Sequence, residues 1–250
     1  MNHEMRPRSF GDIFDHSFQL YTDRFWLLTG ISAVIWIPVG LMLAFGHLAH
    51  LQLAWLADQT WRAGLPVIQM AITYAVANTY LDSPVDITDC YEPIFPLLFR
   101  IGITELLLLI FVIVAFVLLV LPGIYVLVAW SLVPQVMMVE RRWGRDALKR
   151  SENLVKGVWW QTCWMGLILL LIGESFADYT MTWWKVAPLT GPLATSVILS
   201  VVCGYTCSVV AVYYFDRRCR SEGYNLQMLA EELGYRETTR ARLERTPRPV

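Results

Sequence analysis

LPGIYVLVAWSLVPQVMMVERRWGRDALKRSENLVKGVWW, residues Leu121 to Trp160, passes from an apolar segment into a charged one and back. The apolar run 101–121 before it is about long enough to cross the ~30 Å hydrocarbon core as a helix. Leu121-Pro122-Gly123 predicts a tight hairpin, because proline lacks a backbone donor and glycine accepts a reversal. The next apolar segment, 123–139, stops at Glu140-Arg141-Arg142, since consecutive charges need partners in hydrocarbon.

The composition of the chain is that of a membrane protein. Hydrophobic residues make up 56% of its 250 residues and charged residues only 16%, with a mean hydropathy of +0.46. Soluble domains carry about 25% charged residues. The net charge of -1, with basic residues beside the apolar runs, gives no basic face for nucleic acid. The sequence therefore predicts an all-α, polytopic integral membrane helical bundle.

About six transmembrane helices are expected, accompanied by amphipathic cytoplasmic helices. The predicted spans are 25–48, 65–81, 101–121, 123–139, 158–176 and 193–215. Residues 1–24 are expected to form a cytoplasmic amphipathic helix that lies on the membrane surface or docks a partner, with a capping box from Ser9 to Asp12. Residues 216–250 are expected to form a basic cytoplasmic tail with a short helix at 223–234 and a disordered end.

Arginine and lysine indicate which side of the membrane each connection occupies. The connection between spans 123–139 and 158–176 holds six basic residues, whereas the predicted external connections hold only Arg62 and Lys185. By the positive-inside rule, the chain is expected in the bacterial inner membrane with both termini in the cytoplasm. Tyrosines at the ends of apolar runs, such as Tyr213 and Tyr214, are expected at the membrane interface.

Two charged motifs supply the first set of candidate site residues. The basic residues of the connector around Arg145 have near-helical spacing, and Leu148, Ser151 and Val155 form its apolar side. The connector should therefore lie along the inner leaflet, where its basic side meets anionic headgroups. The motif after the last span could pair with it across the bundle. The residues are Arg145, Lys149, Arg150, Lys156, Asp216, Arg218, Arg220 and Glu222. The alternative is that they only set topology.

Polar residues at membrane depth supply the second set, Glu105, Glu174, Gln69 and Asn78. An ionisable group in a span is a functional hypothesis by default, here a proton or cation relay, but both glutamates lie near span ends and a structural role is favoured. Cys203 and Cys207 are one helical turn apart, and packing is a better account of them than metal binding. No catalytic residue, metal site or cofactor is predicted. Small residues at three- and four-residue intervals predict a packing face on the last span: Ser200, Gly204, Ser208 and Ala211.

Three stretches carry a resemblance to a known family: RSFGDIFDHSFQLYTDRF (8–25), LPGIYVLVAWSLVPQVMMVE (121–140) with ALKRSENLVKG (147–157), and YYFDRRCRSEGYNLQMLAEEL (213–233). They resemble the membrane domain of bacterial glycerophosphoryl diester phosphodiesterases, which also occurs as free-standing membrane proteins. The resemblance implies a helical membrane module without phosphodiesterase activity, which in that family belongs to a separate soluble barrel. Asn225, at a position where the family is often acidic, and the polar span 65–81 depart from the pattern.

The leading functional hypothesis is a non-enzymatic membrane scaffold or accessory subunit. It would organise other membrane proteins and contact anionic lipid headgroups. The alternative is a transporter or lipid-handling protein with a polar path around Gln69, Asn78, Glu105 and Glu174. A membrane-embedded enzyme would need clustered acid, base or metal ligands and ranks last.

Overall fold

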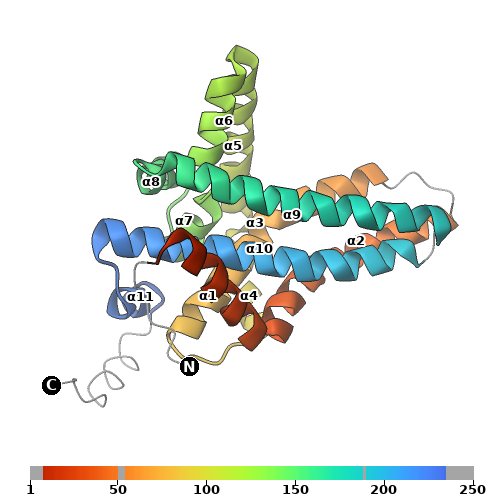
Figure 1. Ribbon diagram of the computed structural model, residues 1–250, viewed down its shortest axis with the longest axis horizontal. Coiled ribbons are helices and arrows are strands. Elements are labelled where there is room, and N and C mark those ends of the chain that lie inside the picture. Colours follow the sequence, from red (N-terminus) through yellow and green to blue (C-terminus); the bar gives the residue numbers. More distant parts are fainter. Residues whose placement is uncertain (1–7, 50–53, 188–189, 235–250) are drawn as a thin grey trace.

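Helices α2, α3, α9 and α10 run alongside one another and form the main bundle in the computed structural model (Figure 1), which describes residues 8–49, 54–187 and 190–234. All regular structure in these residues is helical, as expected. The helices are α1 (Phe10–Asp23), α2 (Phe25–Leu48), α3 (Ala54–Tyr80), α4 (Ile87–Tyr91), the 3-10 helix η1 (Phe95–Leu97), α5 (Leu98–Leu118), α6 (Val120–Ala129), α7 (Val133–Val139), α8 (Arg145–Val155), α9 (Trp159–Val186), α10 (Gly191–Glu222) and α11 (Leu226–Glu232).

Several helices are long and apolar enough to cross a membrane. Among the described residues these are Phe25–Gly46, Ile87–Leu118, Val120–Val139 and Gly191–Glu222. A fifth arises if Arg145–Val155 and Trp159–Phe176, which meet at a bend of 102°, count as one broken span. These are the features of a multi-pass membrane protein, and four or five candidate spans replace the predicted six.

Several helices extend beyond the predicted spans. The predicted span 25–48 has the bounds of α2, but α3 begins at Ala54, well before the predicted start at residue 65. Helix α9 continues ten residues beyond the predicted end of its span, to Val186, and α10 continues to Glu222. The motif expected just after the last span is thus the final part of α10. The expected disordered end, 235–250, lies outside the described residues.

The hairpin predicted at Leu121-Pro122-Gly123 is displaced toward the amino terminus. The chain reverses at Leu119, which has an extended backbone (φ -165°, ψ 144°), and Pro122 lies in the first turn of α6. Proline is tolerated there because the first backbone N–H groups of a helix have no partner within it. A Cβ on Gly123 would lie 2.6 Å from the Phe116 ring. Glycine therefore lets α5 and α6 approach closely.

The predicted span 123–139 is broken into α6 and the short α7. Ser151 of α8 provides partners for the backbone groups at the break. Its hydroxyl donates to the Ala129 carbonyl at 2.8 Å and accepts from the Leu132 N–H at 3.2 Å. Irregular backbone in a membrane protein is acceptable where protein groups replace the missing helical bonds. Every residue of α7 is buried.

Small residues bring α2 and α10 into close contact. A Cβ on Gly204 would lie 3.1 Å from the Leu28 carbonyl, and one on Gly40 would lie 2.2 Å from the Ser196 hydroxyl. Ser200, Ser208 and Ala211, expected with Gly204 on a packing face, are buried too. This confirms the small-residue interface predicted for the last span.

The amphipathic helices bury their apolar sides against the bundle. Helix α1 begins with the predicted capping box, in which Ser9 and Asp12 exchange hydrogen bonds at 3.2 and 3.3 Å. Its Ile13, Leu20 and Tyr21 are buried. Helix α8 buries Ala147, Leu148, Ser151, Leu154 and Val155 in the same way. These side chains therefore contact protein and not the inner leaflet, contrary to the expectation for α8, while Phe18 of α1 stays 58% exposed.

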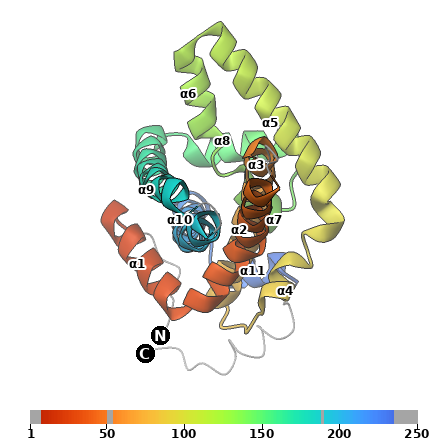
Figure 2. The same ribbon diagram turned by 90° about the vertical axis from the view of Figure 1, so that its right-hand side faces the viewer.

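The α5–α6 hairpin extends sideways from the bundle. Figure 2 views α9 and α10 along their axes, while α5 and α6 lie across the line of sight and project outward. Only 11% of the most apolar part of the Ile87–Leu118 stretch is buried, against 61% for α10.

The role of Ser151 in pairing the broken backbone can be tested with Ser131 as the control. The Ser131 hydroxyl is exposed and donates to the Val128 carbonyl. Ser151→Ala leaves a buried carbonyl and a buried N–H unpaired, so we expect it to lower the free energy of unfolding by about 1–3 kcal/mol. Ser131→Ala should change it by less than about 0.5 kcal/mol. Thermal unfolding of both purified variants in mild detergent measures the difference, and equal midpoints would contradict the assignment.

Candidate functional site

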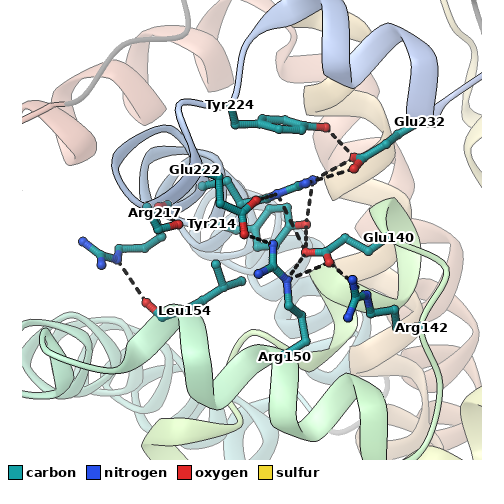
Figure 3. Close-up of polar contacts among 11 residues, drawn as sticks. Glu140, Arg142, Arg150, Leu154, Tyr214, Arg217, Glu222, Tyr224 and Glu232 are labelled. Atoms are coloured by element: carbon teal, nitrogen blue, oxygen red, sulfur yellow. Dashed lines mark hydrogen bonds and ion pairs between the residues drawn. The ribbon is translucent and has the colours of Figure 1, made fainter.

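Charged side chains from four helices meet at one end of the bundle, where α7 ends (Figure 3). We call this group the Glu140–Arg218 network; it also contains Arg142, Arg150, Tyr214, Glu222, Tyr224 and Glu232. The side chains of Glu140 and Arg218 are each only 6% exposed. Charges buried to this degree require partners.

Glu140, the C-cap of α7, accepts bonds from three surrounding helices or loops. Arg150 of α8 places its Nε 2.9 Å from Oε1 and 2.7 Å from Oε2. The Tyr214 hydroxyl of α10 donates to Oε1 at 3.1 Å, and the Arg142 Nε lies 3.2 Å from Oε2. Arg218 adds its Nε at 3.8 Å from Oε1. One carboxylate therefore joins α7, α8 and α10.

Arg218 fastens the carboxy-terminal helix α11 to α10. Its Nη1 and Nη2 bond to the two carboxylate oxygens of Glu232 at 2.7 and 2.9 Å, the bidentate geometry that suits a guanidinium. The guanidinium carbon lies 3.7 Å from the centre of the Tyr224 ring, within reach of a cation–π interaction. The Tyr224 hydroxyl donates to Glu232 at 2.5 Å.

Glu222 and Arg217 link α10 to α8. Glu222 forms an ion pair with Arg150 and accepts a bond from the Arg218 Nε at 3.3 Å. The Arg217 Nε donates to the Leu154 carbonyl at 3.2 Å, near the end of α8. The end of α10 is thereby tied to the connector that precedes α9.

Burial and charge act in opposite directions on these groups. Burial alone would lower the pKa of the Arg150 guanidinium, but hydrogen bonds and the charges of Glu140 and Glu222 raise it above its usual value. Burial raises the pKa of the Tyr224 phenol, so it stays protonated and can donate to Glu232. The network therefore keeps its cations and its hydroxyl donor at physiological pH.

A second group of contacts holds the amino-terminal segment. The Asp216 side chain, 1% exposed, accepts from the Arg8 N–H at 2.6 Å and from the Arg220 Nε at 2.9 Å. Arg220 also donates to the Arg8 carbonyl. Asp216 and Arg220 therefore fix the start of α1 and not the α8 connector.

A polar cavity of about 330 Å³ opens beside the network. Four arginines and three glutamates line it, which gives an excess of one positive charge. The lining residues are Val139, Glu140, Arg141, Arg142, Arg150, Arg218, Glu222 and Glu232. Such a cavity is large enough for a small charged group, and its exposed arginines, Arg141 and Arg142, suit an anion.

The structure brings together part of the first predicted set. Arg150, Arg218 and Glu222 meet in the network, as the pairing hypothesis expected. Arg145, Lys149 and Lys156 are exposed and lie outside it.

Sequence reasoning missed Glu140, Tyr214, Tyr224 and Glu232. Glu140 was read only as the end of a span, and Tyr214 as one of the tyrosines expected at the membrane interface. Tyr213 and Tyr214 are in fact fully buried, with hydroxyls bonded to Thr162 and Glu140. A carboxylate directly before two arginines was the one available signal.

The second predicted set is not gathered at this cavity. Gln69 and Asn78 lie on α3, Glu105 on α5 and Glu174 on α9, and none lines the cavity. Asn78 is buried and donates to the Tyr74 carbonyl at 2.8 Å, whereas Glu174 is exposed. Asn78 Oδ1 and Glu105 Oε1 are buried and accept no hydrogen bond from the described residues.

Metal-ligand types do not cluster in the part of the chain that the structure describes: no three His, Cys, Asp or Glu residues there could hold an ion together. Cys203 and Cys207 are free and buried, with sulfur atoms 3.8 Å apart, and pack inside the bundle.

Comparison with protein families, with curated proteins and with solved structures finds no match to this chain. The network therefore has to be interpreted from its own geometry.

The network predicts a contrast between two arginines that share Glu140. Arg218→Met leaves Glu140 and Glu232 short of a partner in a buried place, and should lower the free energy of unfolding by about 3–5 kcal/mol. Arg142, whose side chain is 53% exposed, is the matched control, and Arg142→Met should cost less than about 1 kcal/mol. Thermal unfolding in detergent measures both, and a cost for Arg218→Met no larger than the control would refute a central role for this residue.

Proposed function

We propose that this protein is a non-enzymatic integral membrane scaffold or accessory subunit of the bacterial inner membrane, with both termini in the cytoplasm. The Glu140–Arg218 network carries the proposal, because it fastens α7, α8, α10 and α11 into one preformed end of the bundle. Most of its charges are used within the chain and do not point at a substrate position. A preformed surface loses little further conformational entropy when a partner binds.

Anionic lipid headgroups are the proposed small partners on the inner leaflet. Arg145, Lys149 and Lys156 are exposed on and just after α8, while the apolar face of α8 is occupied by the bundle. Cations near an anionic surface contribute about 1 kcal/mol each. These residues support attraction to the membrane surface, whereas Arg150 and Arg218 serve the internal network.

The resemblance of three sequence stretches to the membrane domain of glycerophosphoryl diester phosphodiesterases agrees with this proposal. Two of these stretches supply the network, since Arg150 lies in one and Arg218, Glu222 and Glu232 lie in the other. On this proposal the shared motifs hold the cytoplasmic end of a helical membrane module together, and they have no catalytic role.

A lipid-handling protein is the second candidate, and the cavity beside the network favours it. The excess of arginine over glutamate around this 330 Å³ space suits one anionic group at the cytoplasmic end of the bundle. A continuous polar path through the membrane has less support, because Gln69, Asn78, Glu105 and Glu174 lie on three different helices away from this cavity.

Extraction from native membranes in polymer nanodiscs tests the proposal. We expect other protein chains to co-isolate in constant proportion, and anionic lipids to be enriched over the bulk membrane. Replacing Arg145, Lys149 and Lys156 together by Gln should lower that lipid enrichment about fivefold or more, since each charge contributes about 1 kcal/mol.

Asp146→Asn combined with Glu152→Gln is the matched control, since both acidic residues are exposed on the same helix. This variant should retain the enrichment. A protein that is always isolated alone, with lipids in bulk proportions, would eliminate the scaffold proposal. Retained partners with unchanged lipids would eliminate only the headgroup contact.

A further inference from the structure

The α5–α6 hairpin exposes apolar side chains around its whole tip. Val117, Leu118, Leu119, Val120 and Leu121 are 61–80% exposed. No charged residue lies between Glu105 and Glu140 in the sequence. A surface of this kind in a membrane protein belongs in hydrocarbon.

Contacts of α6 place it at the level where α9 begins. The Trp159 indole donates to the Tyr125 carbonyl at 3.2 Å, and the two rings stack with centroids 5.9 Å apart. Trp159 is the first residue of α9 and directly follows the charged connector. Tryptophan and tyrosine favour the membrane–water interface, so the middle of α6 lies near the cytoplasmic interface.

These contacts conflict with α6 and α7 forming one membrane crossing. In such a crossing Val120 would lie at the outer surface and Val139 at the inner one. Tyr125 would then lie in the outer half of the membrane, yet it touches the inner end of α9. Ala129 would lie at mid-membrane, yet its carbonyl accepts a bond from Ser151 of the charged helix α8.

The base of the hairpin is attached at the same level. Thr104 of α5 accepts a hydrogen bond from the Gly144 N–H at 3.0 Å, directly before α8 begins. Both ends of the hairpin are therefore held beside α8, while its length lies across the bundle axis in both views (Figures 1 and 2).

We infer that the α5–α6 hairpin lies in the plane of the cytoplasmic leaflet, with its exposed side chains against lipid acyl chains, and that α2, α3, α9 and α10 make the membrane crossings. The apolar surface of the hairpin is continuous with that of α9 through Tyr125 and Trp159. Exposed cations on α8, beside its base, match the anionic headgroups of that leaflet. Both termini stay in the cytoplasm.

The modest hydropathy of α3 is compatible with crossing, because neighbouring helices shield its second half. Ile68 and the stretch 70–73 are buried, as is the stretch 75–80, in contact with α2, α7 and α10. A helix enclosed by protein does not need an apolar outer surface. The four crossing helices contain 24 to 32 residues, enough for the ~30 Å core at 1.5 Å per residue.

Spin-label depth measurements in vesicles of phosphatidylethanolamine and phosphatidylglycerol test this topology. Ile103, Ile110 and Val117 are exposed and seven residues apart on α5; Trp160, Leu167 and Glu174 repeat this spacing on α9 as the control. Each is changed singly to Cys in a protein whose five native cysteines are replaced by Ala and which elutes as the wild type does. The collision rates of each spin label with oxygen and with a water-soluble nickel chelate report the depth of the label in the bilayer.

We expect the α5 labels to be equally deep in one leaflet and accessible to oxygen. The α9 labels should lie at different depths: the label at Leu167 should be about 10 Å deeper than the one at Trp160, at 1.5 Å per residue, and the one at Glu174 should lie beyond the bilayer midplane. If the depth of the labels changed along α5 as it does along α9, the inference would be wrong and α5 would cross the membrane. Labels on α5 shielded from oxygen, as by a second copy of the chain, or open to the aqueous nickel chelate would exclude acyl chains as the partner.

Discussion

Hydrocarbon cannot solvate a charge or an unpaired backbone group, and this constraint organises the structure. The charged side chains of Glu140, Arg150, Arg218, Glu222 and Glu232 collect at one end of the bundle, where Glu140 and Arg218 find partners on other segments. The broken backbone between α6 and α7 lies against α8 for the same reason, because Ser151 supplies the missing bonds there. Close packing of α2 on α10 at Gly40 and Gly204 then holds the bundle together.

The network fixes one arrangement of α8, α10 and α11 more than it adds to the free energy of unfolding. Removing two charges from water costs several kcal/mol per ion, and their attraction repays this only with good geometry and further hydrogen bonds. Arg218 has that geometry, since its guanidinium is bidentate to Glu232 and covered by the Tyr224 ring. Other packings of α10, α11 and α8 would leave one of these buried charged side chains without a partner. The network therefore selects one surface at this end of the bundle, as the proposed scaffold role would require.

Local patterns in the sequence predicted the local features well. Hydropathy located α2, side-chain spacing identified the capping box at Ser9, and small residues marked the Gly204 face. Features set by tertiary contacts were missed. The reversal at Leu119 places Phe116 over Gly123, and the end of α10 is held by contacts with α8 and α11. In the site, Arg150 and Glu222 were foreseeable from charge, but Glu140 and Glu232 acquire their roles only through partners distant in sequence.

The central claim is that the bundle crosses a membrane with its charged end in the cytoplasm. Single cysteines at Arg145, exposed beside the network, and at Thr190, exposed at the opposite end of α10, test it most directly. In intact cells a membrane-impermeant maleimide should label Thr190→Cys at once and Arg145→Cys only after permeabilisation. Labelling of both from the same side would contradict the account.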